Sequence, residues 1–135
     1  MNRQPLILFL IFAIIYLGLP RPLPAQELRS KKACHQHPQV IGACFRVHGR
    51  LSAYNGAPSL RIWPVGSKRL LGISESRFAL PDFANIPSDL TKQLGDWDNA
   101  MFADFTVCPF TEDIPGVMRL VCVDSAENII VRKRD

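Results

Sequence analysis

The sequence lacks the short motifs that mark common reactions. No serine lies in a nucleophile-elbow pattern, and no glycine-rich loop of the kind that holds phosphate is present. The acidic stretch that begins at Asp96 fails as a calcium-binding EF-hand loop, because Met101 and Val107 replace the required glycine and glutamate. We assign no catalytic residue, no metal and no cofactor. These absences favour a binding protein over an enzyme, with a small hydrolase as the enzymatic alternative.

What the chain has first is a hydrophobic start. Asn2 and Arg3 precede an apolar run over 6–19, and a proline-rich stretch follows and closes at Ala25. A charged start, an apolar segment and a small closing residue are typical of a secretory signal. As a helix the run would rise about 21 Å, short of the roughly 30 Å hydrocarbon core of a membrane. We therefore predict export to the periplasm or the cell exterior after cleavage near Ala25, with a membrane anchor over 6–19 as the alternative.

Cleavage would leave about 110 residues, the size of one compact domain. We divide the chain into a signal peptide at 1–25, a polar N-terminal tail at 26–43 and a single β domain at 44–135. The net charge of +4 is unevenly distributed, since 44–77 is mainly basic and 82–113 mainly acidic. Such a dipolar chain can attract an anionic partner, or its two charged faces can pair with each other.

All four cysteines lie beyond the proposed signal. Export makes disulfides the default interpretation, and four cysteines allow three pairings. We favour Cys108 with Cys122 and Cys34 with Cys44, because Cys108 and Cys122 fall on strands that we expect to form a hairpin. The alternative joins Cys44 to Cys108 or Cys122. The Cys34-His35-Gln36-His37 segment matches none of the usual zinc-ligand spacings.

The pattern of the rest of the chain is that of strands. Apolar and polar residues alternate over 44–53, the period of a half-buried strand. Further strands are predicted over 59–63, 70–73, 101–110, 117–124 and 129–132, with turns at Asn55-Gly56, at Gly66-Ser67 and over 125–128. One short helix is predicted from Ser88 to Gly95, with Leu90 and Leu94 facing the core.

The order of three strands, a short helix and further strands resembles the OB-fold, a five-stranded Greek-key barrel. The residues that carry the resemblance are Val47-His48-Gly49-Arg50-Leu51, whose glycine would let the strand bend, followed by Leu60-Arg61-Ile62-Trp63. The resemblance to the OB-fold covers about residues 44–124. We predict an all-β fold with one short helix, a small OB-like Greek-key barrel, with a small β-sandwich or a six-stranded barrel as alternatives. The whole chain also resembles small exported bacterial proteins.

The candidate ligand-binding surface is the outward face of the first two predicted strands. Cationic groups next to aromatic rings can hold an anionic polymer, the cation contacting charge and the ring stacking on sugars or bases. We predict an anionic glycan or envelope polymer as partner. Intracellular nucleic acid is not expected. A membrane is expected as partner only if the N-terminal segment stays uncleaved. The alternative is a structural or assembly protein that self-associates through its basic and acidic halves. The predicted binding residues are Arg46, His48, Arg50, Tyr54, Arg61 and Trp63.

Overall fold

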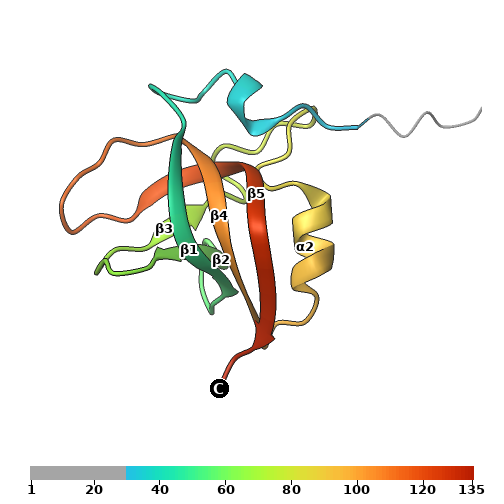
Figure 1. Cartoon of the computed structure of the whole chain (residues 1–135). Coiled ribbons are helices and arrows are strands. Elements are labelled where there is room, and N and C mark those ends of the chain that lie inside the picture. The colour runs from blue at the N-terminus through green and yellow to red at the C-terminus, as the bar shows by residue number, and fades with distance from the viewer. Residues whose placement is uncertain (1–29) are drawn as a thin grey trace, which may run out of the picture.

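The structure, a computed structural model, describes residues 30–135, so the predicted signal peptide lies outside the described residues. The prediction of a mostly β chain with one short α-helix is confirmed (Figure 1). The elements are the 3-10 turn η1 (Cys34–Gln36), β1 (Phe45–Ala53), β2 (Leu60–Pro64), β3 (Leu71–Ile73), α2 (Ser88–Leu94), β4 (Asn99–Pro109) and β5 (Arg119–Lys133).

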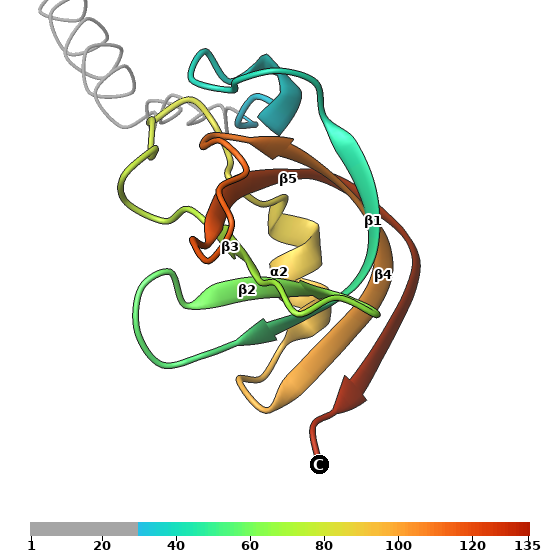
Figure 2. The same ribbon diagram turned by 90° about the vertical axis from the view of Figure 1, so that its left-hand side faces the viewer.

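The five strands form one sheet that closes into a ring in the order β1-β2-β3-β5-β4 (Figure 2). Four of the contacts are antiparallel, and the contact between β3 and β5 is parallel. A two-sheet sandwich and a six-stranded barrel, the alternatives to a five-stranded fold, do not match this sheet. In the part of the chain that the structure describes, no helix has the length and apolar character needed to cross a membrane.

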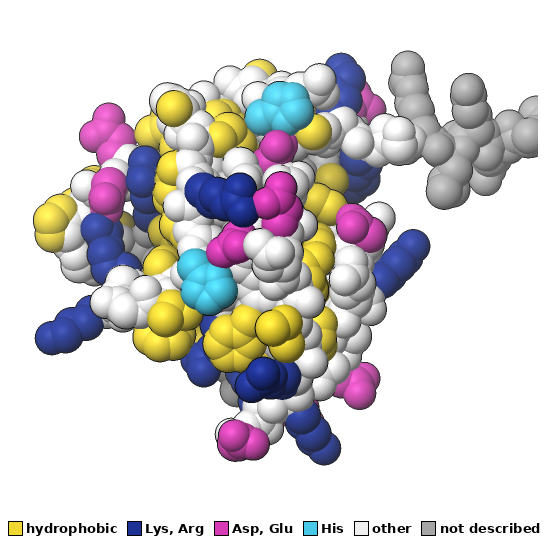
Figure 3. All heavy atoms as spheres, viewed as in Figure 1, with side chains coloured by type: hydrophobic (Ala, Val, Ile, Leu, Met, Phe, Trp, Pro, Cys, Tyr) yellow, Lys and Arg dark blue, Asp and Glu magenta, His cyan; other side chains and the backbone are white. Residues whose placement is uncertain are grey.

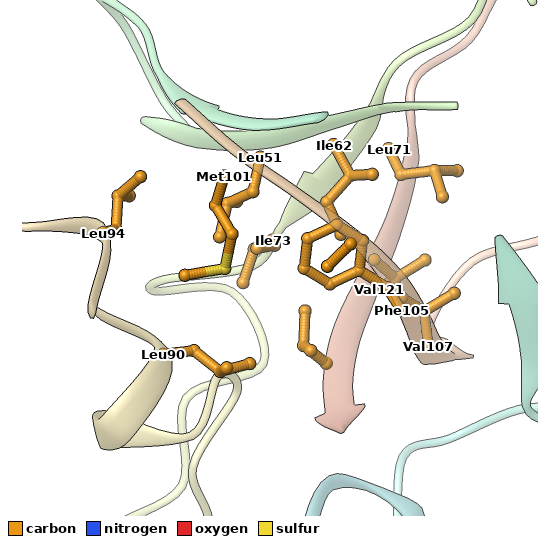
Figure 4. Packing of buried hydrophobic residues seen from close by; sticks show 12 residues of the cluster. Leu51, Ile62, Leu71, Ile73, Leu90, Leu94, Met101, Phe105, Val107 and Val121 are labelled. Carbon is orange, nitrogen blue, oxygen red and sulfur yellow. The ribbon is translucent and has the colours of Figure 1, made fainter. Parts of the chain in front are cut away.

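The alternation predicted for β1 is present. Leu51 is fully buried inside the ring, whereas Arg46 and Arg50 of the same strand lie on the outer face. Figure 4 shows Leu51 and Ile62 packing with Met101, Phe105 and other inward residues of β4 and β5. Because successive side chains of a strand point to opposite faces, the same alternation that builds this core also spaces the charged residues along the outside.

α2 closes one end of the core, as the sequence predicted. Leu90 and Leu94 lie four residues apart on one face of the helix and are 2% and 5% exposed. Both belong to the same hydrophobic cluster as the inward residues of the strands (Figure 4). The helix ends before Gly95, whose φ of 68° is a conformation that glycine adopts without steric cost.

The predicted turn over 125–128 is wrong. The chain instead continues as one strand, β5, and accommodates one extra residue against β4 at each of two β-bulges. One bulge falls between the pairs Phe102↔Ile130 and Asp104↔Glu127, where Asn128 has a φ of 54°. A bulge bends its strand and increases the local twist. The polar residues that indicated a turn therefore mark the place where a long strand curves around the ring.

The favoured disulfide pairing is also wrong. The structure contains Cys34–Cys122 and Cys44–Cys108, so the alternative bridge from Cys44 to Cys108 is the correct one. Cys108 and Cys122 are register partners on β4 and β5, as the predicted hairpin requires. Two residues further along the chain, the amide of Phe110 donates to the carbonyl of Leu120, so these two residues form a hydrogen-bonded pair. Because hydrogen-bonded and non-hydrogen-bonded pairs alternate along an antiparallel ladder, Cys108 and Cys122 form a hydrogen-bonded pair too. Side chains of such a pair stand farther apart than those of a non-hydrogen-bonded pair, which disfavours a bridge between them.

Both bridges instead fasten the segment before β1 to the sheet. This segment crosses over one end of the ring, opposite the end where β5 terminates (Figure 1). Disulfides of this kind stabilise a small domain by about 2 to 5 kcal/mol each. Two of them indicate that the chain folds in an oxidising compartment.

The outer side of β3 is covered by neighbouring loops. A Cβ atom at Gly72 would lie 2.6 Å from Cγ of Pro58 and 2.8 Å from Sδ of Met118, so a larger residue would force these side chains to move. Pro58 belongs to the loop between β1 and β2, and Met118 to the loop between β4 and β5. The open outer surface of the sheet is therefore formed by β1, β4 and β5, together with the outward residues of β2.

Candidate functional site

The six predicted binding residues lie on the outer face of β1 and β2 or in the loop between them, but they do not form one group. On β1, Arg46 and His48 lie opposite Thr106 and Asp104 of β4, whereas Arg50 lies opposite Phe102. This register divides the alternating basic residues of one strand between two environments. In Figure 3, histidine, basic and acidic side chains follow one another down this face, and hydrophobic and basic side chains gather at its lower end.

The first environment is a group of paired charges that we call the paired cluster. Arg46 donates to Glu127 at 2.6 Å and lies 3.7 Å from Asp104. Nδ1 of His48 is 2.8 Å from Asp104, and the side-chain amide of Asn128 donates to the same carboxylate at 2.7 Å. The cluster consists of Arg46, His48, Asp104, Glu127 and Asn128.

These contacts perturb the ionisation of the cluster. The hydrogen bond from Asn128, followed by that from His48, lowers the pKa of Asp104 below its usual value. The hydrogen bond to Glu127 raises the pKa of Arg46. Both effects stabilise the charged forms of Asp104 and Arg46, which already have partners in the molecule, so Arg46 offers little free positive charge to a ligand.

The second environment surrounds Arg50. Its guanidinium lies over the ring of Trp63, with Cζ 5.3 Å from the ring centroid, a cation–π contact. Nε of Arg50 is buried and has no hydrogen-bond partner, and among the described residues Arg50 forms no ion pair. Cross-strand from it, Phe102 of β4 offers an apolar side chain instead of an acid. Arg50 is thus the outward basic residue of β1 whose charge is left uncompensated.

The end of β5 and the residue after it add three further cations beside Arg50: Arg132, Lys133 and Arg134. Arg132 pairs with Ala100 of β4, two residues before Phe102, the partner of Arg50, so Arg132 and Arg50 lie diagonally across β4 from each other. The result is a hollow of about 580 Å³, which we call the basic hollow. It contains two acids against four basic residues. Its lining residues are Arg50, Asp98, Ala100, Phe102, Arg132, Lys133, Arg134 and Asp135.

The β5 residues of the basic hollow were missed by the sequence prediction. The run Arg132-Lys133-Arg134 is the only signal that could have indicated them, and its distance along the chain from β1 hid the connection. Arg134 has a structural part as well, because it donates to the carbonyls of Ala53 and Trp97 and so fastens the end of the chain to the sheet.

The remaining predicted residues organise the edge of this region. Arg61 donates to the carbonyls of Pro58 and Asn55, which holds the β1–β2 loop. Cζ of Arg61 lies 5.1 Å from the ring centroid of Tyr54, and Cζ of Arg134 lies 5.9 Å from it. Tyr54 thereby links the predicted residues to the basic hollow. Trp63 is held in place because its Nε1 donates to the carbonyl of Ser67 at 2.8 Å.

The side chains of Cys34, His35 and His37 each contact a different residue of the molecule. Nδ1 of His35 lies 2.7 Å from Asp124, and buried His37 contacts the carbonyl of Phe78 through Nε2. The sulfur atoms of Cys34, Cys108 and Cys122 lie within 4.8 Å of one another, but all three belong to the two disulfides. Thiolates that could ligate a metal are therefore lacking at this cluster.

Comparison of the chain with protein-family models, with curated proteins and with solved structures finds no match. Any function must therefore be argued from the geometry of the site.

Proposed function

We propose that the closed sheet is an OB-like Greek-key barrel. Three features support this assignment: the strand order β1-β2-β3-β5-β4, the parallel contact between β3 and β5, and the position of α2 between β3 and β4. OB-folds bind ligands mainly over their second and third strands, and in this chain Pro58 and Met118 cover the β3 part of that surface. The candidate ligand surface is accordingly shifted to the outer face of β1, β4 and β5.

We further propose that the protein is an exported, non-catalytic binding module for an anionic ligand of the cell envelope or the extracellular medium. The observation that carries this proposal is Arg50, a guanidinium with a buried, unpartnered Nε beside a hollow that Arg132 also lines. Two guanidinium groups around a hollow suit carboxylate, sulfate or phosphate groups, since each can donate two parallel hydrogen bonds to one anion.

Dextran sulfate is a suitable probe, because it is a soluble anionic polymer without a base or a lipid. We expect the double variant Arg50→Ser/Arg132→Ser to weaken its binding by about tenfold or more at low salt. The matched control is Arg46→Ser/Arg69→Ser, which also removes two arginines but takes both from ion pairs. Binding to that variant should change by less than about twofold. Equal effects of the two changes would contradict the proposal.

Self-association through charged surfaces is the alternative that this experiment must separate. It is less well supported, because Arg46 and Arg69 already pair with Asp104 and Asp113 of the acidic segment in the same molecule. Sedimentation at two salt concentrations tests it: self-association through exposed charges weakens when salt screens them within about 10 Å at 0.1 M. A monomer at both concentrations supports the binding module.

A further inference from the structure

Within residues 30–135, the lower half of β5 has an unpaired edge. β3 pairs with β5 only over Arg119, Leu120 and Val121, and the next outward amide, that of Val123, donates to the carbonyl of Asn85. Beyond these residues β5 continues to Lys133, where β4 is its one strand partner in the part of the chain that the structure describes. In Figure 1 this half of β5 forms the border of the sheet on the side of α2.

The register identifies which backbone groups face outward. The amide of Arg134 donates to the carbonyl of Asp98, and the pairs Arg132↔Ala100 and Ile130↔Phe102 continue the same ladder. In an antiparallel pair, alternate residues direct their N–H and C=O groups towards the partner strand. Val131 and Lys133 therefore direct theirs away from β4. Among the described residues no hydrogen bond satisfies these groups, and we call the stretch 130–133 the free edge.

The side chains of the free edge point to the nature of its partner. Ile130 and Val131 are 51% and 37% exposed, an apolar surface that another strand would cover. Arg132 and Lys133 are exposed cations, and Arg132 also lines the basic hollow next to Arg50. A strand added here would lie beside uncompensated positive charge on the outer face.

We propose that the free edge binds an extended acidic peptide segment of another protein by strand addition. This inference rests on the proposed anion-binding function and assigns the anionic groups to carboxylates of a polypeptide. An added antiparallel strand would bond to the outward groups of Val131 and Lys133. Its alternate side chains would lie on the outer face beside Ile130 and Arg132, where Glu or Asp residues reach the basic hollow. The intervening side chains would lie beside Val131, where apolar residues fit.

The probe is a peptide of eight residues in which Glu and Val alternate, capped at both ends. In the proposed pairing the Glu residues are opposite Arg132, so their amides face solvent and the Val amides face the free edge. N-methylation of the Val residues should therefore weaken binding to the wild-type protein by about tenfold or more, whereas N-methylation of the Glu residues should change it by less than about threefold.

A protein variant gives a second, independent test. Val131→Pro removes an outward amide without removing a hydrogen bond to β4, because proline is tolerated where the N–H of an edge strand faces solvent. It should weaken peptide binding by about tenfold and leave dextran sulfate binding within about twofold of wild type. The peptide series needs no variant protein, so it decides the question even if Val131→Pro does not fold.

The outcomes separate the two proposals. If the two N-methylated peptides bind equally, or if a dimer that Val131→Pro abolishes occupies the edge without peptide, strand addition of an acidic peptide is overturned while anion binding can stand. If neither the peptide nor dextran sulfate binds the wild-type protein, the proposed function itself fails.

Discussion

The paired cluster and the basic hollow occupy the same face of the same sheet and differ in what β4 and β5 place opposite β1. His48 faces Asp104, and Arg46 reaches Glu127, so the charges of the paired cluster are compensated within the molecule. Arg50 faces Phe102, and the β5 residues that line the hollow, Arg132 and Lys133, are both cations. A pattern of basic residues on one strand thus leaves free positive charge only where the neighbouring strands supply no counter-charge.

The two regions also differ in how their polar groups are satisfied. The paired cluster joins β1, β4 and β5 through side-chain hydrogen bonds, which adds cross-strand contacts to the ladder. The basic hollow leaves a buried donor, Nε of Arg50, without a partner. An unpaired buried donor costs stability, and within the described residues the basic hollow lacks the hydrogen bonds between side chains that the paired cluster has.

The change with the largest expected effect transfers the arrangement of the paired cluster to the hollow. Phe102→Asp places a carboxylate opposite Arg50, as Asp104 lies opposite His48. The new acid should pair with Arg50 or Arg132 and weaken dextran sulfate binding by about tenfold, measured by titration at low salt. Phe102→Asn is the control, because it is polar and uncharged. If the asparagine variant loses as much affinity, the aromatic ring and not the missing counter-charge is what matters.

The reverse change opens the paired cluster. Asp104→Asn removes the carboxylate shared by His48, Arg46 and Asn128, which leaves Arg46 with Glu127 alone. We expect dextran sulfate to bind about threefold more tightly at low salt, with the gain disappearing as salt screens the exposed charges. Asp89→Asn on α2 makes the same change in net charge away from this face. A similar gain in that control would attribute the effect to net charge alone.

A smaller effect is expected from the ring beneath Arg50. Trp63→Leu removes the cation–π contact that holds the guanidinium in place, an interaction of about 0.5 to 1 kcal/mol at an exposed site. Binding should weaken by about two- to threefold. Trp97→Leu, at a tryptophan that is 52% exposed in the loop before β4, is the matched control. No difference between the two variants would mean that Trp63 does not position Arg50.

The smallest expected effect concerns pH and stability. Because the pKa of Asp104 is lowered in the folded chain, its charged form stabilises the fold at pH values above the unfolded value of about 4, and this contribution is lost as the pH falls through the folded value. The stability difference between wild type and Asp104→Asn should therefore be larger at pH 7 than at pH 3, measured by urea unfolding. A difference that does not change with pH would indicate that the carboxylate contributes only through shape.

Much of the fold could be predicted because it depends on local pattern. The alternation over β1, the short helix with Leu90 and Leu94 on one face, and the stop at Gly95 all follow from backbone periods and steric preferences. The end of the chain could not be predicted in this way. Residues 125–128 carry turn residues, yet pairing with β4 holds them in β5 as a bulge around Asn128. Long-range hydrogen bonds overrode the local preference.

The candidate site was predicted only in part for the same reason. The outward direction of Arg46, His48 and Arg50 is a local property of a strand, and the sequence by itself determined it, together with the number of cysteines available for disulfides. Which arginine keeps a free charge, which cysteines pair, and which β5 residues join the hollow depend on register between strands far apart in the chain. Only the tertiary structure decided these points, because a charge or a thiol acquires its partner through distances in space that no spacing along one strand records.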